Sequence, residues 1–227
     1  MDLATYKQEY EGRDDASPGW DAINGQLARV YGDREPENHW GTVIPYGLGG
    51  PDPIHGVSAF WRDEGYVHYI SYGMSELWYN EDAVGGEFSQ WGFEFTFRLA
   101  LTAVELPTLE GEKWSAPIWP VNLMNNLARY VFERERWFEA GHFIPANGPI
   151  MADAGTELVG LLFVDDPELG GIETVHGHVD FLQMVGLTQT ELDRLFSDED
   201  CRSALIDAVS ASDPLMVTNL SRTTPYF

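Results

Sequence analysis

The stretch that most constrains the fold is residues 91–101, which read W-G-F-E-F-T-F-R-L-A-L. Every odd position carries a large apolar side chain, and every even position carries a small or polar one. Because successive side chains of a β-strand point to opposite faces, this alternation predicts a long central strand with one buried wall. The wall would consist of Trp91, Phe93, Phe95, Phe97, Leu99 and Leu101, with Glu94, Thr96 and Arg98 pointing away from it.

Helices and further strands are predicted on both sides of this strand. Ser17 and Gly32 are typical start and stop signals of a helix between them, and residues 120–139 carry a second apolar stripe at helical spacing. The other predicted elements are a hairpin of residues 57–62 and 66–71, strands at 158–164, 179–185 and 215–218, and two short helices, one opened by a Thr188–Glu191 capping box and one over 198–209. Since strands and helices do not alternate strictly, we expect an α+β fold with a mixed, largely antiparallel sheet packed against helices.

The length of the chain suits a single domain. With 227 residues and a hydrophobic content of 44%, the chain can bury a substantial core, and it has no internal repeat or long Gly/Ser linker. Residues 1–16 are polar, mixed in charge and without periodicity, so we expect a loose N-terminal arm. The single domain is then expected over residues 17–227.

The net charge of −24, from 37 acidic and 13 basic side chains, restricts the possible partners. A surface that binds nucleic acid or an anionic membrane needs Lys and Arg, so neither partner is expected. An acidic surface keeps a protein soluble, and it also attracts a basic protein by electrostatic steering. Cys201 is the only cysteine, which excludes an intramolecular disulfide. With no secretion signal and no long apolar run, the sequence predicts a cytoplasmic protein.

One short motif raises the question of an enzyme. In His176-Gly177-His178, alternate residues of an extended strand face the same way, so the two imidazoles could share a metal ion. No further His or Cys lies nearby, and Asp165 belongs to D-D-P-E-L-G-G, where Pro and Gly mark a surface turn. We therefore predict no metal, no cofactor and no catalytic residue. A hydrolase or metal-dependent enzyme that uses these residues is the alternative.

Aromatic side chains are abundant, with 8 Trp, 10 Tyr and 12 Phe. Most occupy core positions of the predicted elements, where a large apolar area is needed. Exposed Trp and Tyr are preferred anchors of protein interfaces, so the aromatic residues outside the clear core patterns are candidates for binding. They are Trp40, Tyr46, Tyr72, Trp78 and Tyr79.

In their order and spacing, several segments resemble the Suppressor of fused domain. Around the strand at 91–101 stand P-D-P-I-H-G-V-S at 51–58, H-Y-I-S-Y-G-M-S-E-L-W at 68–78 and W-P-V-N-L-M-N-N-L-A-R-Y-V-F at 119–132. Further matching segments are E-L-G at 168–170, V-D-F-L-Q-M-V-G-L at 179–187 and D-P-L-M-V-T-N-L-S-R at 213–222. The resemblance covers about residues 20–222, which is most of the chain.

The resemblance implies that the chain binds another protein and is not an enzyme. In animal members a second domain follows, and a transcription-factor peptide is clamped between the two domains as an added β-strand. The segment around Tyr69, Ser71, Tyr72 and Gly73 resembles a part of the family domain near that cleft, which adds Tyr69 to the candidates. Short stand-alone versions resemble bacterial members, many of which are regarded as immunity proteins that neutralise toxins of polymorphic toxin systems. A cognate toxin domain is therefore the expected partner, and a regulatory role beside a transcription factor is the second alternative.

Overall fold

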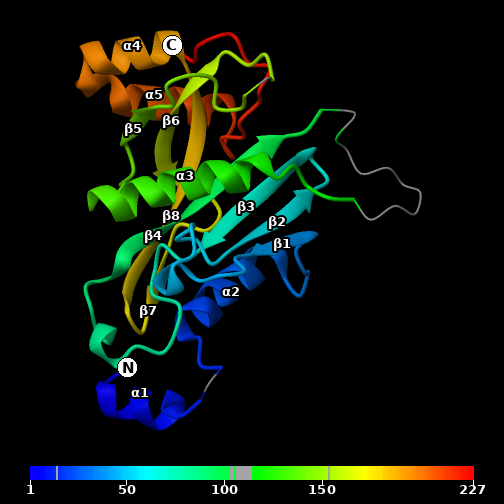
Figure 1. Ribbon diagram of the computed structural model, residues 1–227. Coiled ribbons are helices and arrows are strands. Elements are labelled where there is room, and N and C mark those ends of the chain that lie inside the picture. Colours follow the sequence, from blue (N-terminus) through cyan, green and yellow to red (C-terminus); the bar gives the residue numbers. More distant parts are fainter. Residues whose placement is uncertain (14, 103–104, 106–113, 153) are drawn as a thin grey trace.

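The protein is built on one eight-stranded sheet (Figure 1). The computed structural model describes residues 1–13, 15–102, 105, 114–152 and 154–227. The strands are β1 Asn38–Gly41, β2 Gly56–Arg62, β3 Tyr66–Tyr72, β4 Phe88–Ala100, β5 Phe143–Pro145, β6 Leu158–Asp165, β7 Gly171–Thr174 and β8 Gly177–Thr188. Their order is β1-β2-β3-β4-β8-β6-β5, with β7 also paired to β8. The β4–β8 pair is parallel and the other named pairs are antiparallel, so the predicted mixed, largely antiparallel sheet is confirmed.

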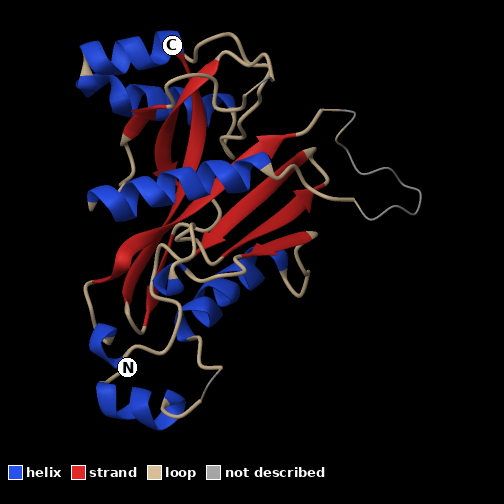
Figure 2. Ribbon diagram, in the orientation of Figure 1, coloured by secondary structure: helices blue, strands red, loops and turns tan. Residues whose placement is uncertain are grey.

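Five α-helices accompany this sheet in the part of the chain that the structure describes (Figure 2). They are α1 Leu3–Tyr10, α2 Pro18–Tyr31, α3 Trp119–Arg134, α4 Gln189–Ser197 and α5 Arg202–Ser212. The predicted helix start at Pro18, the 57–71 hairpin and the Thr188–Glu191 capping box are all present. None of these helices is long and apolar enough to cross a membrane.

Two predicted elements differ from the structure. Helix α3 ends at Arg134 because Glu135 adopts a left-handed backbone with φ of 52°. The prediction extended this helix to Glu139. Because the chain leaves the helix after Arg134, Phe138 can stack on Phe163, with ring centroids 4.1 Å apart. The predicted strand at 215–218 is reduced to a single parallel bridge between Leu99 and Thr218.

Strand β4 buries its odd positions under α3, as predicted. The buried residues of this wall are Phe93, Phe95, Phe97 and Leu99. They share one core cluster with Val121, Met124, Leu127, Ala128 and Val131 of α3, which lies across the front of the sheet in Figure 1. Trp91 and Leu101, at the two ends of the wall, are only partly buried. The strand pattern and the helical stripe are therefore two halves of the same core.

The opposite face of the sheet is also covered. Helix α2 packs Ile23 and Leu27 against Ile70 and Phe181 at one end, and α4 and α5 form a further apolar cluster with β6 and β8 at the other. The even side chains of β4 therefore point away from the α3 wall but not into solvent. Glu94, Thr96 and Arg98 are all fully buried. Polar groups in such a position need partners inside the protein.

The N-terminal segment is not the loose arm that the sequence predicts. It forms α1, and the side chain of Tyr6 is completely buried. The Tyr6 ring stacks on Tyr79, with centroids 5.0 Å apart. Its hydroxyl accepts a hydrogen bond from the Asn80 N–H at 3.0 Å and donates to His176 Nε2 at 2.9 Å. Tyr6 is the buried residue of this helix, and one buried side chain leaves no periodic pattern for a sequence prediction to detect.

We expect Tyr6→Phe to lower the free energy of unfolding by about 1–3 kcal/mol, because the Asn80 N–H and His176 would be left buried without this partner. Denaturant unfolding measures the change. Tyr130→Phe, which removes the hydroxyl of an exposed ring, is the control and should cost less than about 0.5 kcal/mol. Equal effects of the two substitutions would show that α1 is not docked through this hydroxyl.

Candidate protein-binding site

The six aromatic candidates are divided between core and surface. Tyr69 and Tyr72 lie in β3 and are buried. The Tyr69 hydroxyl donates to the Pro117 carbonyl at 2.9 Å, so this ring belongs to the core and leaves no surface for a partner. Trp40 is half-buried and stacks on Tyr69. Tyr79 is partly buried and stacks on Tyr6 of the helix α1.

Tyr46 and Trp78 are the two exposed candidates, with 36% and 44% of their surfaces accessible. Both line one cavity of about 220 Å³, which we call the loop cavity. The Tyr46 ring meets Phe132 edge-on at 5.3 Å, and the Trp78 ring meets His55 edge-on at 5.9 Å. Two loops that are distant in the sequence therefore place large aromatic side chains around the same hollow.

A buried carboxylate holds the loop that carries Trp78. Glu94 accepts hydrogen bonds from the Ser71 hydroxyl at 2.6 Å, the Gly73 N–H at 2.9 Å, and the Ser75 N–H and hydroxyl at 3.0 and 2.6 Å. Burial raises the pKa of Glu94, and these donors oppose that rise. Gly73 has φ of 131°, and a Cβ there would lie 2.8 Å from the backbone nitrogen of His55. The hydrogen bonds to the buried Glu94 thus hold the turn after β3 in place, and this turn positions Trp78.

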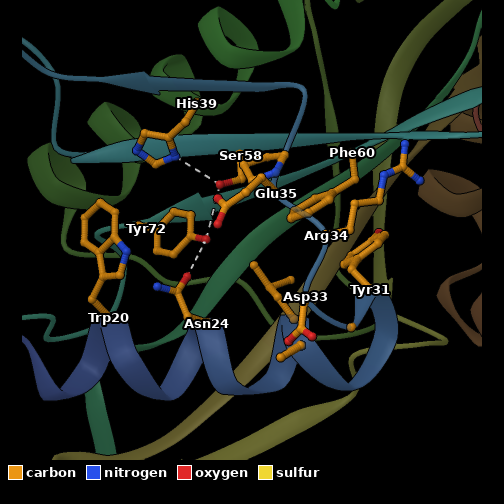
Figure 3. A pocket seen from close by; sticks show the side chains of 14 residues that line it. Trp20, Asn24, Tyr31, Asp33, Arg34, Glu35, His39, Ser58, Phe60 and Tyr72 are labelled. Atoms are coloured by element: carbon orange, nitrogen blue, oxygen red, sulfur yellow. Dashed lines mark hydrogen bonds between the residues drawn. The ribbon is translucent and has the colours of Figure 1, made fainter.

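A second cavity of about 510 Å³ lies between α2 and strands β1 to β3 (Figure 3). We call it the edge cavity, because β1 is the last strand at this side of the sheet. Its wall contains a chain of hydrogen bonds: His39 Nδ1 donates to Ser58 at 3.0 Å, Ser58 to the Tyr72 hydroxyl at 3.2 Å, and Tyr72 to Asn24 Oδ1 at 3.1 Å. The cavity therefore offers ordered polar groups beside aromatic rings.

Trp20 connects the two cavities. Its ring stacks on Tyr72 at 4.4 Å and lies 5.9 Å from the ring of Trp78. Two groups of rings, Tyr46 with Phe132 and Trp78 with Trp20 and Tyr72, meet at the loop cavity, and we call these five residues the aromatic belt. Trp20 and Phe132 were missed as site residues because helical spacing places each of them with the core residues of its helix. Only their position at the end of a helical stripe distinguishes them in the sequence.

The polar residues on the covered face of β4 form a buried network around Asp166. This carboxylate accepts from His68 Nε2 at 3.0 Å, the Thr96 hydroxyl at 2.8 Å, and two Arg98 nitrogens at 2.7 and 3.0 Å. Arg98 also binds Glu168 at 2.8 Å. The D-D-P-E-L-G-G segment is therefore not a plain surface turn, as its Pro and Gly indicated. It places one acidic side chain in the core.

This network extends to α2 through His68 and Tyr31. Burial lowers the pKa of His68, so its ring is neutral, donates from Nε2 to Asp166 and accepts at Nδ1 from the Tyr31 hydroxyl at 2.6 Å. Burial also raises the pKa of Tyr31, which keeps its proton. The Tyr31–His68–Asp166 chain consequently ties α2 and the β6–β7 turn to the centre of the sheet.

The two histidines of the metal-like motif do not converge. His176 accepts from Tyr6, and its Nδ1 donates to the Glu76 carbonyl at 3.2 Å. His178 instead contacts Asp180 at 2.9 Å and Glu173 at 2.7 Å, which raises the pKa of His178. Among the residues that the structure describes, no group of three His, Cys, Asp or Glu side chains could hold a metal ion.

Comparison with known proteins agrees with the family resemblance. The model of the Suppressor of fused protein (SUFU) family matches residues 50–223. The chain is 33% identical over 220 residues to the Suppressor of fused homolog of Homo sapiens, and equally to that of Mus musculus. The chain belongs to the Suppressor of fused family. The match covers 90% of the chain but only 43% of the human protein, so the chain spans less than half the length of these curated relatives.

Solved SUFU structures share this fold. A chain in the crystal structure of the Sufu-Fu complex superposes with a TM-score of 0.83 at 29% identity, with 94% of both chains covered. Drosophila Suppressor of Fused gives 0.81 at 31% identity, covering 93% of this chain and 52% of that one. A Neisseria gonorrhoeae protein described as a SUFU homolog shares the fold at 13% identity, with a TM-score of 0.61 over 91% of this chain and 96% of that one.

Proposed function

We propose that this SUFU-type chain is a non-enzymatic protein-binding module whose partner contacts the aromatic belt. The observation that carries the proposal is the exposed Trp78, held over the loop cavity beside Tyr46 by a loop anchored on Glu94. The similar chain from the Sufu-Fu complex supports it, because that structure contains a family protein with a partner.

The physical properties of the belt suit binding more than catalysis. A rigid, exposed Trp can bury a large area on contact while losing little conformational entropy. The polar groups of the edge cavity can then fix the orientation of the bound segment, as in pockets that combine apolar walls with a few placed donors and acceptors. Among the described strands β1 lies at the edge of the sheet, and its His39 lines this cavity, so a partner that occupies the cavity also lies beside the edge strand.

For the partner we propose a basic protein, and specifically a toxin domain that the chain neutralises in the cytoplasm. The support is the net charge of −24 together with the short bacterial members that the chain resembles. Opposite charge accelerates association over distances of about 10 Å at 0.1 M salt, whereas aromatic groups act only in contact. Charge should therefore control the association rate, and the belt should control dissociation.

The test is a pull-down with the full chain from cells of the source organism, followed by binding kinetics with the recovered partner. Trp78→Ala should weaken binding by about 2 kcal/mol or more, mainly through faster dissociation. Raising the salt concentration should mainly slow the association of the unchanged protein. Phe196→Ala removes another exposed aromatic ring, on α4 and outside the belt, and should leave the affinity unchanged.

Each of the three parts of the proposal has its own contradicting result. If Trp78→Ala binds like the unchanged protein, the belt is not the contact surface. An acidic partner, or an association rate that does not respond to salt, would contradict the electrostatic part and leave the belt as a binding site. A captured partner without toxin activity in a growth assay would contradict the immunity role alone.

A further inference from the structure

A third cavity, of about 360 Å³, lies next to the aromatic belt at an irregularity in β4. The β4–β8 register pairs Phe88 with His178 and then Phe93 with Asp180, so five steps along β4 oppose two steps along β8. Within the bulge, Gln90 has a left-handed backbone with φ of 54°. Strained backbone of this kind persists where the surroundings enforce it, and bulges often lie beside functional sites. We call this hollow the bulge cavity.

The walls of the bulge cavity are aromatic and its charged groups are acidic. It is lined by Phe88, Trp91, Trp137, Phe138, Glu139 and Asp180, among others, and none of the lining residues is Lys or Arg. Phe88 and Trp137 are more than half exposed, which is unusual for rings of this size in a protein whose other aromatic residues are mostly packed. Aromatic faces and carboxylates both attract cations.

The two carboxylates at the cavity are positioned by contacts with ring nitrogens. The Trp137 indole N–H donates to Glu139 Oε1 at 2.8 Å, which orients both side chains. His178 contacts Asp180 Oδ1 at 2.9 Å. Burial and the charge of the neighbouring Asp180 raise the pKa of Asp165.

From this arrangement we infer that the bulge cavity binds an arginine side chain of a protein partner. A guanidinium is planar, so it can stack on the Trp137 or Trp91 ring while its N–H groups reach the carboxylates of Glu139 and Asp180. A lysine ammonium lacks this planar stacking. The site borders the belt, because Trp91 meets Phe132 edge-on at 5.4 Å and Gln90 lines both the bulge cavity and the loop cavity. Trp137, Glu139 and Asp180 do not line the loop cavity, so substitutions there test the bulge cavity independently of Trp78.

The probe is a capped pentapeptide, acetyl-Gly-Gly-Arg-Gly-Gly-amide, titrated into the full chain while the indole N–H signals are followed by NMR. We expect the Trp137 signal to shift, and we expect the same peptide with citrulline, the neutral counterpart of arginine, to bind at least about tenfold more weakly. The lysine peptide and free L-arginine should also bind more weakly. Equal binding of arginine and citrulline peptides, or tighter binding of lysine or free arginine, would overturn the assignment.

Matched variants locate the site. Glu139→Gln and Asp180→Asn should each weaken binding of the arginine peptide several-fold, and Trp137→Leu should abolish most of it, whereas Glu157→Gln removes an equal charge from an exposed position elsewhere and should have no effect. Trp78→Leu should leave the peptide affinity unchanged even if it weakens capture of the partner, which separates this site from the belt. If Glu139→Gln and Glu157→Gln weaken peptide binding equally, the effect comes from the overall charge of the protein. That result would contradict a specific site at the bulge cavity.

Discussion

Phe95→Ala is expected to lower the free energy of unfolding by about 3–5 kcal/mol, the usual cost of removing a large aromatic ring from a core. Phe95 is completely buried at the centre of β4. Its ring lies 5.0 Å from Phe93 and 6.1 Å from both Phe138 and Phe163. The loss would therefore leave a cavity between strands β4 and β6 and the segment that follows α3, where surrounding side chains are already held by the sheet.

Chemical denaturation with matched slopes measures this effect. The control is Phe196→Ala, which removes the same ring from an exposed position on α4 and should cost less than about 1 kcal/mol. An unchanged denaturation midpoint for Phe95→Ala would contradict the assignment of β4 as the centre of the core.

Asp166→Asn should destabilise the protein by a similar amount, about 3–5 kcal/mol at neutral pH, because it removes the fully buried carboxylate that pairs with Arg98 and leaves only the partly exposed Glu168. Asp166 and Arg98 are both buried and joined by two hydrogen bonds, at 2.7 and 3.0 Å. An exposed ion pair provides the control. Glu81→Gln breaks the pair with Lys7 on the surface and should cost less than about 1 kcal/mol.

The Asp166→Asn substitution should also change how the free energy of unfolding depends on pH. Although burial opposes it, the contacts with His68 and the Arg98 guanidinium hold the pKa of Asp166 well below its usual range. In the unfolded chain Asp166 takes up a proton near pH 4, so its stabilising effect is complete above about pH 4 and is lost as the pH falls below it. The difference in unfolding free energy between the two proteins should therefore shrink from pH 7 to pH 3.

His68 adds an acid-sensitive contribution of its own. Burial lowers the pKa of His68, so the fold keeps this ring neutral while the unfolded chain takes up a proton below about pH 6.5. Stability from this group is present above that pH and declines on acidification. Because Asp166→Asn leaves the imidazole in place, part of the acid loss between pH 6.5 and pH 4 should remain in the variant. A difference between the two proteins that stays constant down to pH 3 would contradict a depressed pKa of Asp166.

The secondary structure could largely be predicted from the sequence because its signals are local. The period of two at residues 91–101 specifies one face of β4, and Pro18 and the Thr188–Glu191 pair mark the starts of α2 and α4. The SUFU family was also evident in the sequence, since the matching segments keep their order and spacing. The local signals and the family resemblance both predicted the α+β fold class.

What the sequence did not determine is which residues meet. A strand pattern states that Glu94 and Arg98 share a face but not that α2, α4 and α5 enclose it, and the Pro and Gly around Asp166 indicate a turn without indicating its depth. The aromatic belt brings together residues 20, 46, 72, 78 and 132, and the buried Tyr6 docks α1 against Tyr79. Such contacts are long-range, and their energies depend on burial and partners that exist only after the sheet has formed, which is why the tertiary structure alone decided them.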